Sequence, residues 1–235
     1  MVKRLVMEEL VRTIKFPIVF DIERLKTDVQ KVLSHKWIDH YNTNCYSGKW
    51  TSIALMSHSG KSDAIYAFSN NNEPIVNTEV LDSCDYFKSI LDDFLFEKTA
   101  VRLLQLAVGA EIKPHSDNCL GYEDDSFRLH IPIITNSEVE FILDGNRIIM
   151  NEGECWYIDA NFIHSVANRG KNDRIHLVID GIRNEWTDKL FFAEANPNQF
   201  IKPKAIMSEE EKQLMIAELQ RMNSKVADDL IKGLE

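Results

Sequence analysis

The sequence lacks any apolar run long enough to span a membrane or to form the apolar part of a signal peptide. Near the N-terminus, the acidic residues Glu8 and Glu9 interrupt a stretch of basic and apolar residues. We therefore expect neither a signal peptide nor a contact with a membrane, and we predict a cytoplasmic location.

Cysteine and positive charge are also scarce. The four cysteines lie far apart without a C-x-x-C pair, which excludes a zinc ribbon and a redox dithiol and predicts free thiols in a reducing compartment. Lysine and arginine number 27 against 37 aspartates and glutamates, which gives a formal net charge of -10. A nucleic-acid-binding protein carries a basic face, so we expect no nucleic-acid partner.

Strand patterns dominate the chain from Val101 onward. Short segments rich in valine, isoleucine and aromatic residues follow one another, bounded by glycine, asparagine or aspartate. The Asp144-Gly145 pair in "LDGNRI" is typical of a tight hairpin turn. Closely spaced strands with tight turns predict an antiparallel sandwich or barrel, such as a double-stranded β-helix of the jelly-roll kind. Strands do not alternate with helices here, so a parallel α/β sheet is not expected.

Helical patterns lie on both sides of this region. Apolar residues at helical spacing predict a helix at Ile22–Leu33 with Asp21 as its N-cap, and a second helix at Glu79–Glu97. Beyond residue 200, Ser208 and Glu211 form a capping box ahead of an apolar helical stripe.

The fold class that these patterns predict is mainly β with flanking helices. We expect a double-stranded β-helix domain at residues 1–200, with N-terminal α/β elements and a core at about 101–182, followed by a C-terminal helical extension at 201–235. The apolar stripe of the extension either docks on this domain or forms a homodimer contact, and the sequence leaves both alternatives open.

His115 and Asp117, in the motif "HSD", are two positions apart. Residues at this spacing point to the same side of a strand, so an imidazole nitrogen and a carboxylate oxygen can meet at one point. His164, about fifty residues downstream, is the candidate third ligand. Two histidines and one carboxylate on one face of a metal leave positions open, as in non-haem Fe(II) oxygenases, whereas a structural zinc site is closed by four ligands.

Arg174 follows His164 by ten positions and begins an apolar strand pattern. A charge in such a strand is costly unless it is paired. Arg174 therefore either binds a dicarboxylate through a bidentate contact or forms a salt bridge at the strand end.

The segments "RLHIPI", "GECWYID" and "HSVANRGKNDRIHLVIDG" make the chain resemble the aspartyl/asparaginyl β-hydroxylase family, and especially its small bacterial members that include proline cis-4-hydroxylase. The likeness extends from about Trp50 to Gly181. It implies a double-stranded β-helix, Fe(II), 2-oxoglutarate and O2. It also implies roles for individual residues: His115, Asp117 and His164 as iron ligands, Arg174, Arg128 and His130 at 2-oxoglutarate, and Arg102, Trp50 and Arg128 at the substrate.

The chain departs from the family pattern at two positions. It keeps Asp117, a ligand that the animal β-hydroxylases lack, and it has Leu104 where those enzymes have a serine. We therefore expect a hydroxylase of a free amino acid, such as proline or a related one, that releases succinate and CO2. A hydroxylase of Asp or Asn side chains in a peptide or protein, and a cupin-like metal enzyme that does not use 2-oxoglutarate, stay open as alternatives.

Two further interpretations concern the acid-rich segment "NCLGYEDDS". Its acids could pair with Arg128, and Asp124 and Asp125 are the nearest in sequence. The segment itself is expected to be a solvated loop at the mouth of the pocket, and the sequence leaves open whether it acts as a lid with Gly121 as its hinge.

Overall fold

The computed structural model describes residues 9–66, 74–202, 209–222 and 224–232. The chain divides into two compact units, with the boundary between Ile201 and Lys202. Both β-sheets lie in the larger unit, and the other unit contains the helices α5 (Glu209–Met222) and α6 (Lys225–Lys232). Among the described helices, none combines the length and the apolar character that crossing a bilayer requires.

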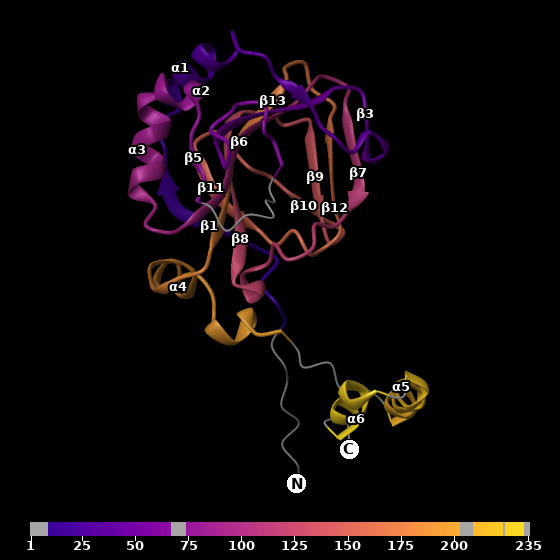
Figure 1. Ribbon diagram of the computed structural model, residues 1–235. Coiled ribbons are helices and arrows are strands. Elements are labelled where there is room, and N and C mark those ends of the chain that lie inside the picture. The colour runs from indigo at the N-terminus through magenta and orange to yellow at the C-terminus, as the bar shows by residue number, and fades with distance from the viewer. Residues whose placement is uncertain (1–8, 67–73, 203–208, 223, 233–235) are drawn as a thin grey trace. The chain divides into compact units, whose positions relative to one another are not determined.

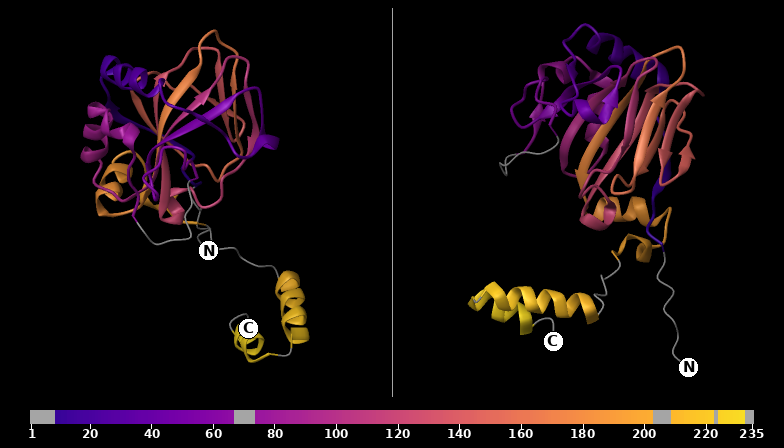
Figure 2. Two further views of the ribbon diagram at one scale, coloured as in Figure 1. Left: turned by 45° about the horizontal axis from the view of Figure 1, so that its top comes forward. Right: turned by 90° about the vertical axis from the view of Figure 1, so that its right-hand side faces the viewer.

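Two antiparallel sheets face each other in the larger unit (Figures 1 and 2). The larger sheet has the order β1-β11-β8-β13-β6-β4-β2, with β5 beside β4. Its strands are β1 (Thr13–Val19), β2 (Ile38–Asp39), β4 (Trp50–Ser57), β5 (Val76–Asn77), β6 (Lys98–Leu106), β8 (Ser126–Ile134), β11 (Glu154–Ile158) and β13 (Arg174–Ile182).

The smaller sheet has five strands in the order β10-β9-β12-β7-β3. They are β3 (Tyr46–Ser47), β7 (Glu111–His115), β9 (Val139–Leu143), β10 (Asn146–Ile148) and β12 (His164–Asn168). Strands that are far apart in sequence are neighbours in both sheets, as a double-stranded β-helix requires. The predicted fold class, mainly β with flanking helices, is confirmed.

Helices cover the outer side of the larger sheet, as Figure 1 shows for α1 (Ile22–Val32), α2 (Glu79–Asp82) and α3 (Asp85–Asp93). The main apolar core lies between these helices and the sheet and includes Leu25, Phe87 and Leu177, all fully buried. A second, smaller apolar cluster, which includes Leu106, Phe141 and Val166, joins the two sheets. The helix α4 (Glu185–Phe192) adds Phe191 to the main core.

The first predicted helix is confirmed, since α1 begins after Asp21, whose carboxylate accepts a hydrogen bond from the backbone N–H of Arg24. The single helix predicted at Glu79–Glu97 is wrong, because the chain breaks there into α2 and α3. Asp28 of α1 explains the break: its carboxylate accepts from the backbone N–H groups of Tyr86 and Phe87 at 2.9 and 3.0 Å. An acid from another helix thus caps a new helix start, which periodicity alone cannot reveal.

The predicted hairpin at Asp144-Gly145 joins β9 to β10. Both residues have positive φ angles, 47° and 77°, which is the conformation of a tight two-residue hairpin turn. The predicted capping residue Ser208 lies outside the described residues.

Candidate metal centre

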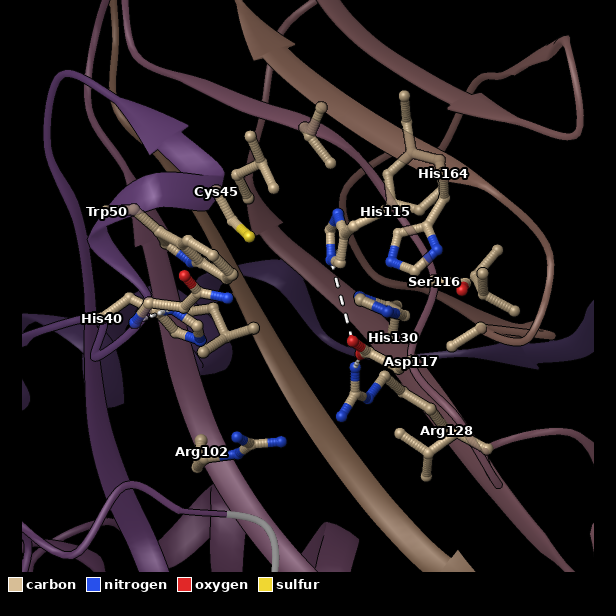
Figure 3. Close-up of a pocket in the computed structure, with 18 of the residues that line it drawn as sticks. His40, Cys45, Trp50, Arg102, His115, Ser116, Asp117, Arg128, His130 and His164 are labelled. Carbon is tan, nitrogen blue, oxygen red and sulfur yellow. Dashed lines mark hydrogen bonds and ion pairs between the residues drawn. The ribbon is translucent and has the colours of Figure 1, made fainter.

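A cavity of about 400 Å³ opens between the two sheets (Figure 3). Its walls come from the inner faces of β6, β8 and β13 on one side and of β7, β9 and β12 on the other. The segment from His40 to Trp50 closes a third side. All the predicted site residues line this cavity: Trp50, Arg102, His115, Asp117, Arg128, His130, His164 and Arg174.

His115, Asp117 and His164 come together at one point of the cavity wall. One potential ligand atom from each lies within 4.8 Å of the other two, and no other such group occurs among the described residues. The pairing of β7 with β12 produces this convergence, because His115 and His164 are direct partners across the two antiparallel strands. Their ring centroids are 4.3 Å apart.

Both histidines are held by their Nδ1 atoms. His115 Nδ1 lies 2.9 Å from the carbonyl oxygen of Lys113, and His164 Nδ1 lies 2.9 Å from that of Phe162. A carbonyl oxygen can only accept, so Nδ1 carries the proton and Nε2 keeps its lone pair for a metal. Burial lowers the pKa of His164 to about 4, which keeps this imidazole neutral at physiological pH.

One carboxylate oxygen of Asp117 is free to bind a metal, and the other accepts a hydrogen bond. Its Oδ2 accepts a hydrogen bond of 2.6 Å from Arg128 Nη1, while Oδ1 lies 3.8 Å from His115 Nε2. Burial by itself would raise the pKa of Asp117, but Arg128, His164 and His115 outweigh burial and lower that pKa. The carboxylate is therefore ionised and its free oxygen faces the histidines (Figure 3).

This donor set fits a divalent metal with open coordination positions. Two imidazole nitrogens and one carboxylate oxygen are the ligand types of non-haem Fe(II) sites. A closed structural zinc site needs four protein ligands, and the described residues supply three here.

Arg174 is a buried cation without a carboxylate partner among the described residues. It is 2% exposed and begins β13, and its Nε has no hydrogen-bond partner. Its Nη2 donates to Nδ1 of His176 at 2.9 Å. Burial lowers the pKa of Arg174 to about 9. The salt bridge considered as an alternative for Arg174 is thus absent from the described structure, and the guanidinium faces the cavity uncompensated.

His130 and His176 lie beside this arginine. Their ring centroids are 5.7 Å apart, and both rings are buried. His130 Nδ1 and His176 Nε2 have no hydrogen-bond partner. Burial, followed by the nearby Arg174, lowers the pKa of both histidines well below the ordinary value, so both rings are neutral. Polar atoms buried without partners next to an unpaired cation are suited to receiving an anionic ligand.

Arg102 and Arg128 share a partner that the sequence analysis missed, Asp180 of β13. Asp180 Oδ1 accepts from Arg128 Nε at 2.6 Å, and Oδ2 accepts from Arg102 Nη2 at 2.7 Å. The partners suggested for Arg128 from the sequence, Asp124 and Asp125, are therefore not its partners. The alternation of side chains along β13 could have revealed Asp180. It is six positions after Arg174, an even number, and so lies on the same face of the strand.

Trp50 and His40 form an aromatic wall on the far side of the cavity. Their rings stack with centroids 3.6 Å apart and planes 10° apart (Figure 3). Burial and then the charge of Arg102 lower the pKa of His40 to about 4, so this ring is also neutral. His40 is a second residue that the sequence analysis missed, because it stands in an irregular segment without a motif.

The acid-rich segment considered as a possible lid is anchored at its centre. Tyr122 is fully buried, and its ring stacks on Phe191 with centroids 3.7 Å apart. Its hydroxyl lies 2.8 Å from a carboxylate oxygen of Asp188. A Cβ atom at Gly121 would lie 2.3 Å from Nδ2 of Asn161, so a larger residue at this position would clash with Asn161. This packing anchors the segment at Tyr122, and a lid hinged at Gly121 stays an open hypothesis.

Comparison with known proteins matches a family and individual relatives. The sequence model described as aspartyl/asparaginyl beta-hydroxylase matches residues 20–184. An L-proline cis-4-hydroxylase from Rhizobium meliloti is 27% identical over 218 residues, covering 92% of this chain and 71% of that protein. An L-proline cis-3-hydroxylase from a Streptomyces species is 26% identical over 183 residues, covering 76% of this chain and 63% of that protein.

Among solved structures, a 2OG-Fe(II) oxygenase family oxidoreductase from Burkholderia pseudomallei resembles the chain with a TM-score of 0.50. The match is 13% identical and covers 73% of this chain and 86% of that one. At this identity the likeness concerns the fold, which is the fold predicted from the sequence.

Proposed function

Because the chain belongs to the aspartyl/asparaginyl β-hydroxylase family, we propose that it hydroxylates a C–H bond of a small amino acid with Fe(II), 2-oxoglutarate and O2. The observation that carries this proposal is that three metal-binding side chains and an unpaired buried arginine line one cavity. The relatives at 27% and 26% identity are proline hydroxylases, which supports a free amino acid such as proline as the substrate.

In this proposal His115, Asp117 and His164 hold the iron. When bound, Fe(II) and 2-oxoglutarate use O2 to place a hydroxyl group on the substrate, and 2-oxoglutarate leaves as succinate and CO2. The protein keeps both histidines in the tautomer that presents Nε2, through the carbonyl groups of Lys113 and Phe162.

Arg174 and His130 form the 2-oxoglutarate end of the cavity. The planar guanidinium of Arg174 can donate two parallel hydrogen bonds to a carboxylate of 2-oxoglutarate. That carboxylate would supply the negative charge that Arg174 lacks. Leu104, Phe141 and Val166 supply apolar wall to the same cavity, which would keep water away from this ion pair and strengthen it.

Arg102, Arg128 and Trp50 form the substrate end. Arg128 already donates Nε, Nη1 and Nη2 to the carboxylates of Asp117 and Asp180. Arg102 donates both Nη atoms, to Ile65 and Asp180, but its Nε has no hydrogen-bond partner. We therefore assign the substrate carboxylate mainly to Arg102, with Arg128 beside it and the stacked rings of Trp50 and His40 as the apolar wall. Holding the carboxylate at one point fixes which carbon faces the metal.

Three further statements belong to the proposal. Residues 1–200 are the oxygenase domain and 201–235 a helical extension whose apolar stripe could join two copies of the chain. The cytoplasm is the proposed location, which the four free cysteines support: Cys45, Cys84, Cys119 and Cys155.

Turnover of 2-oxoglutarate against a panel of free amino acids tests the function. Purified protein with Fe(II), ascorbate and 2-oxoglutarate should form succinate with proline or a related amino acid, and the product should gain one oxygen atom by mass. His164→Ala should lower this turnover by about 100-fold or more, because losing a ligand exceeds the 10–100-fold effect of losing a partner of a ligand.

Ser165→Ala is the matched control, since Ser165 is the next residue of β12 and points to the other side of the strand. It should keep the wild-type turnover. Hydroxylation of Asp or Asn in peptides with no turnover of any free amino acid would show that the substrate class is wrong. Product formation without succinate would show that the enzyme does not use 2-oxoglutarate.

A further inference from the structure

Asp180 is a buried carboxylate that joins two arginines of the cavity. It is 1% exposed and lies on the inner face of β13, opposite Arg128 of β8 in the strand register. Its Oδ1 accepts from Arg128 Nε at 2.6 Å, and its Oδ2 accepts from Arg128 Nη2 at 3.0 Å and Arg102 Nη2 at 2.7 Å. Both oxygens are thus occupied by guanidinium groups.

The contacts continue from Asp180 to the metal centre. Arg128 turns its remaining donor, Nη1, to Oδ2 of Asp117 at 2.6 Å, which leaves the other oxygen of Asp117 for the metal. In the opposite direction, Arg102 lines the cavity at the end that we assign to the substrate (Figure 3). A continuous series of charge-assisted hydrogen bonds therefore runs from Arg102 through Asp180 and Arg128 to Asp117.

We propose that Asp180 is a positioning residue that orients the metal-binding oxygen of Asp117 and the substrate-binding guanidinium of Arg102 at the same time. This inference rests on the proposed function. A guanidinium is planar and its donors are fixed in direction, so two bonds to Asp180 set the direction in which Arg128 presents Nη1. Without Asp180, two buried cations would face each other and repel.

A merely structural role would be limited to neutralising Arg102 and Arg128, and it would show only as lost stability. The positioning role also predicts weaker binding of a metal to the protein before any 2-oxoglutarate or substrate is added. Partners of metal ligands typically contribute 10–100-fold to metal affinity.

Titration of the metal-free protein with Co(II), followed by the visible absorption of the bound ion, tests this inference. Asp180→Asn keeps the shape but removes the charge, and it should weaken Co(II) binding about 10-fold. It should also raise the KM for the amino-acid substrate through Arg102. Asp28→Asn is the matched control, because Asp28 is an equally buried acid that caps α3 away from the cavity. It should lower stability and leave Co(II) affinity unchanged.

Two arginine variants keep the test decisive if Asp180→Asn does not fold. Arg128→Lys keeps the charge but cannot reach two carboxylates with fixed geometry, and it should also weaken Co(II) binding about 10-fold. Arg102→Gln should raise the substrate KM and leave Co(II) binding at the wild-type value.

Wild-type Co(II) affinity in a folded Asp180→Asn protein, or in Arg128→Lys, would overturn the inference. Failure of the wild-type protein itself to bind Co(II) would instead count against the proposed function, so the two failures are distinguishable.

Discussion

The two faces of strand β13 are equally buried but carry opposite kinds of side chain. The outer face packs into the main apolar core with Ile175, Leu177 and Ile179. The inner face carries Arg174, His176 and Asp180, each no more than 2% exposed. Within the described residues, seven buried side-chain atoms lack a hydrogen-bond partner, and four of them belong to residues that line the cavity.

The outer face of β13 therefore contributes mainly to stability, and the inner face contributes to function. The outer face removes apolar surface from water, which is the main source of folding free energy. The inner face keeps polar atoms buried without partners, which opposes folding until a ligand arrives. A change on the outer face should therefore alter stability, and a change at the unpaired inner-face residue Arg174 should alter ligand binding.

Replacement of the unpaired inner-face cation should give the largest effect. Arg174→Met should raise the KM for 2-oxoglutarate about 30-fold or more, since loss of one partner of a buried charge pair costs about 2–5 kcal/mol. The same variant should unfold at an equal or higher temperature without ligand, because an uncompensated buried charge is gone. Added 2-oxoglutarate should raise the unfolding temperature of the wild type but not of the variant.

Arg169→Met is the control, because Arg169 pairs with Glu111 at an exposed position. It should leave the KM for 2-oxoglutarate unchanged. A clear loss of ligand-free stability in Arg174→Met would mean that Arg174 supports the fold, and the contrast between the two faces would then be wrong.

A substitution that leaves an empty space on the outer face should lower stability and leave ligand binding unchanged. Leu177 is fully buried between the sheet and the helices, and Leu177→Ala should lower the free energy of unfolding by about 2–5 kcal/mol. Urea unfolding measures this loss. The KM for 2-oxoglutarate of the folded protein should not change. A large rise in that KM would show that the two faces are coupled.

The buried histidines of the cavity region, His40, His130 and His176, should make stability depend on pH. Burial holds the pKa of His40 at about 4 and places those of His130 and His176 well below the ordinary value of 6.5. The unfolded chain takes up protons near pH 6.5, whereas the folded protein does so only at lower pH. The contribution of these histidines to stability is therefore complete above pH 6.5 and decreases as the pH falls toward 4. Urea unfolding of the metal-free protein across this range should show the decrease, and a flat profile would contradict it.

Much of the fold follows from local patterns. The strand pattern after Val101, the cap at Asp21 and the turn at Asp144-Gly145 each depend on neighbouring residues, and the structure contains each of them. The break between α2 and α3 could not be predicted, because its cause is Asp28, more than fifty residues earlier.

The same limit applies to the site. The spacing of His115 and Asp117 identifies a pair that one strand end brings together, and the structure places His164 beside them. Asp180 and His40 were missed because their significance depends on partners across strands, Arg102 for Asp180 and the stacked Trp50 for His40. Sequence reasoning finds groups that share a strand more readily than groups that share a cavity.

The direct pairing of His115 with His164 bears on how related sequences can diverge. A shift of β12 by one residue against β7 would turn the side chains of β12 to the opposite face and separate the two histidines. The hairpin at Asp144-Gly145, between β9 and β10, tolerates a change of length without moving β12 against β7. Insertions and deletions compatible with activity should therefore collect in the turns between Asp117 and His164, while the lengths of β7 and β12 stay constant.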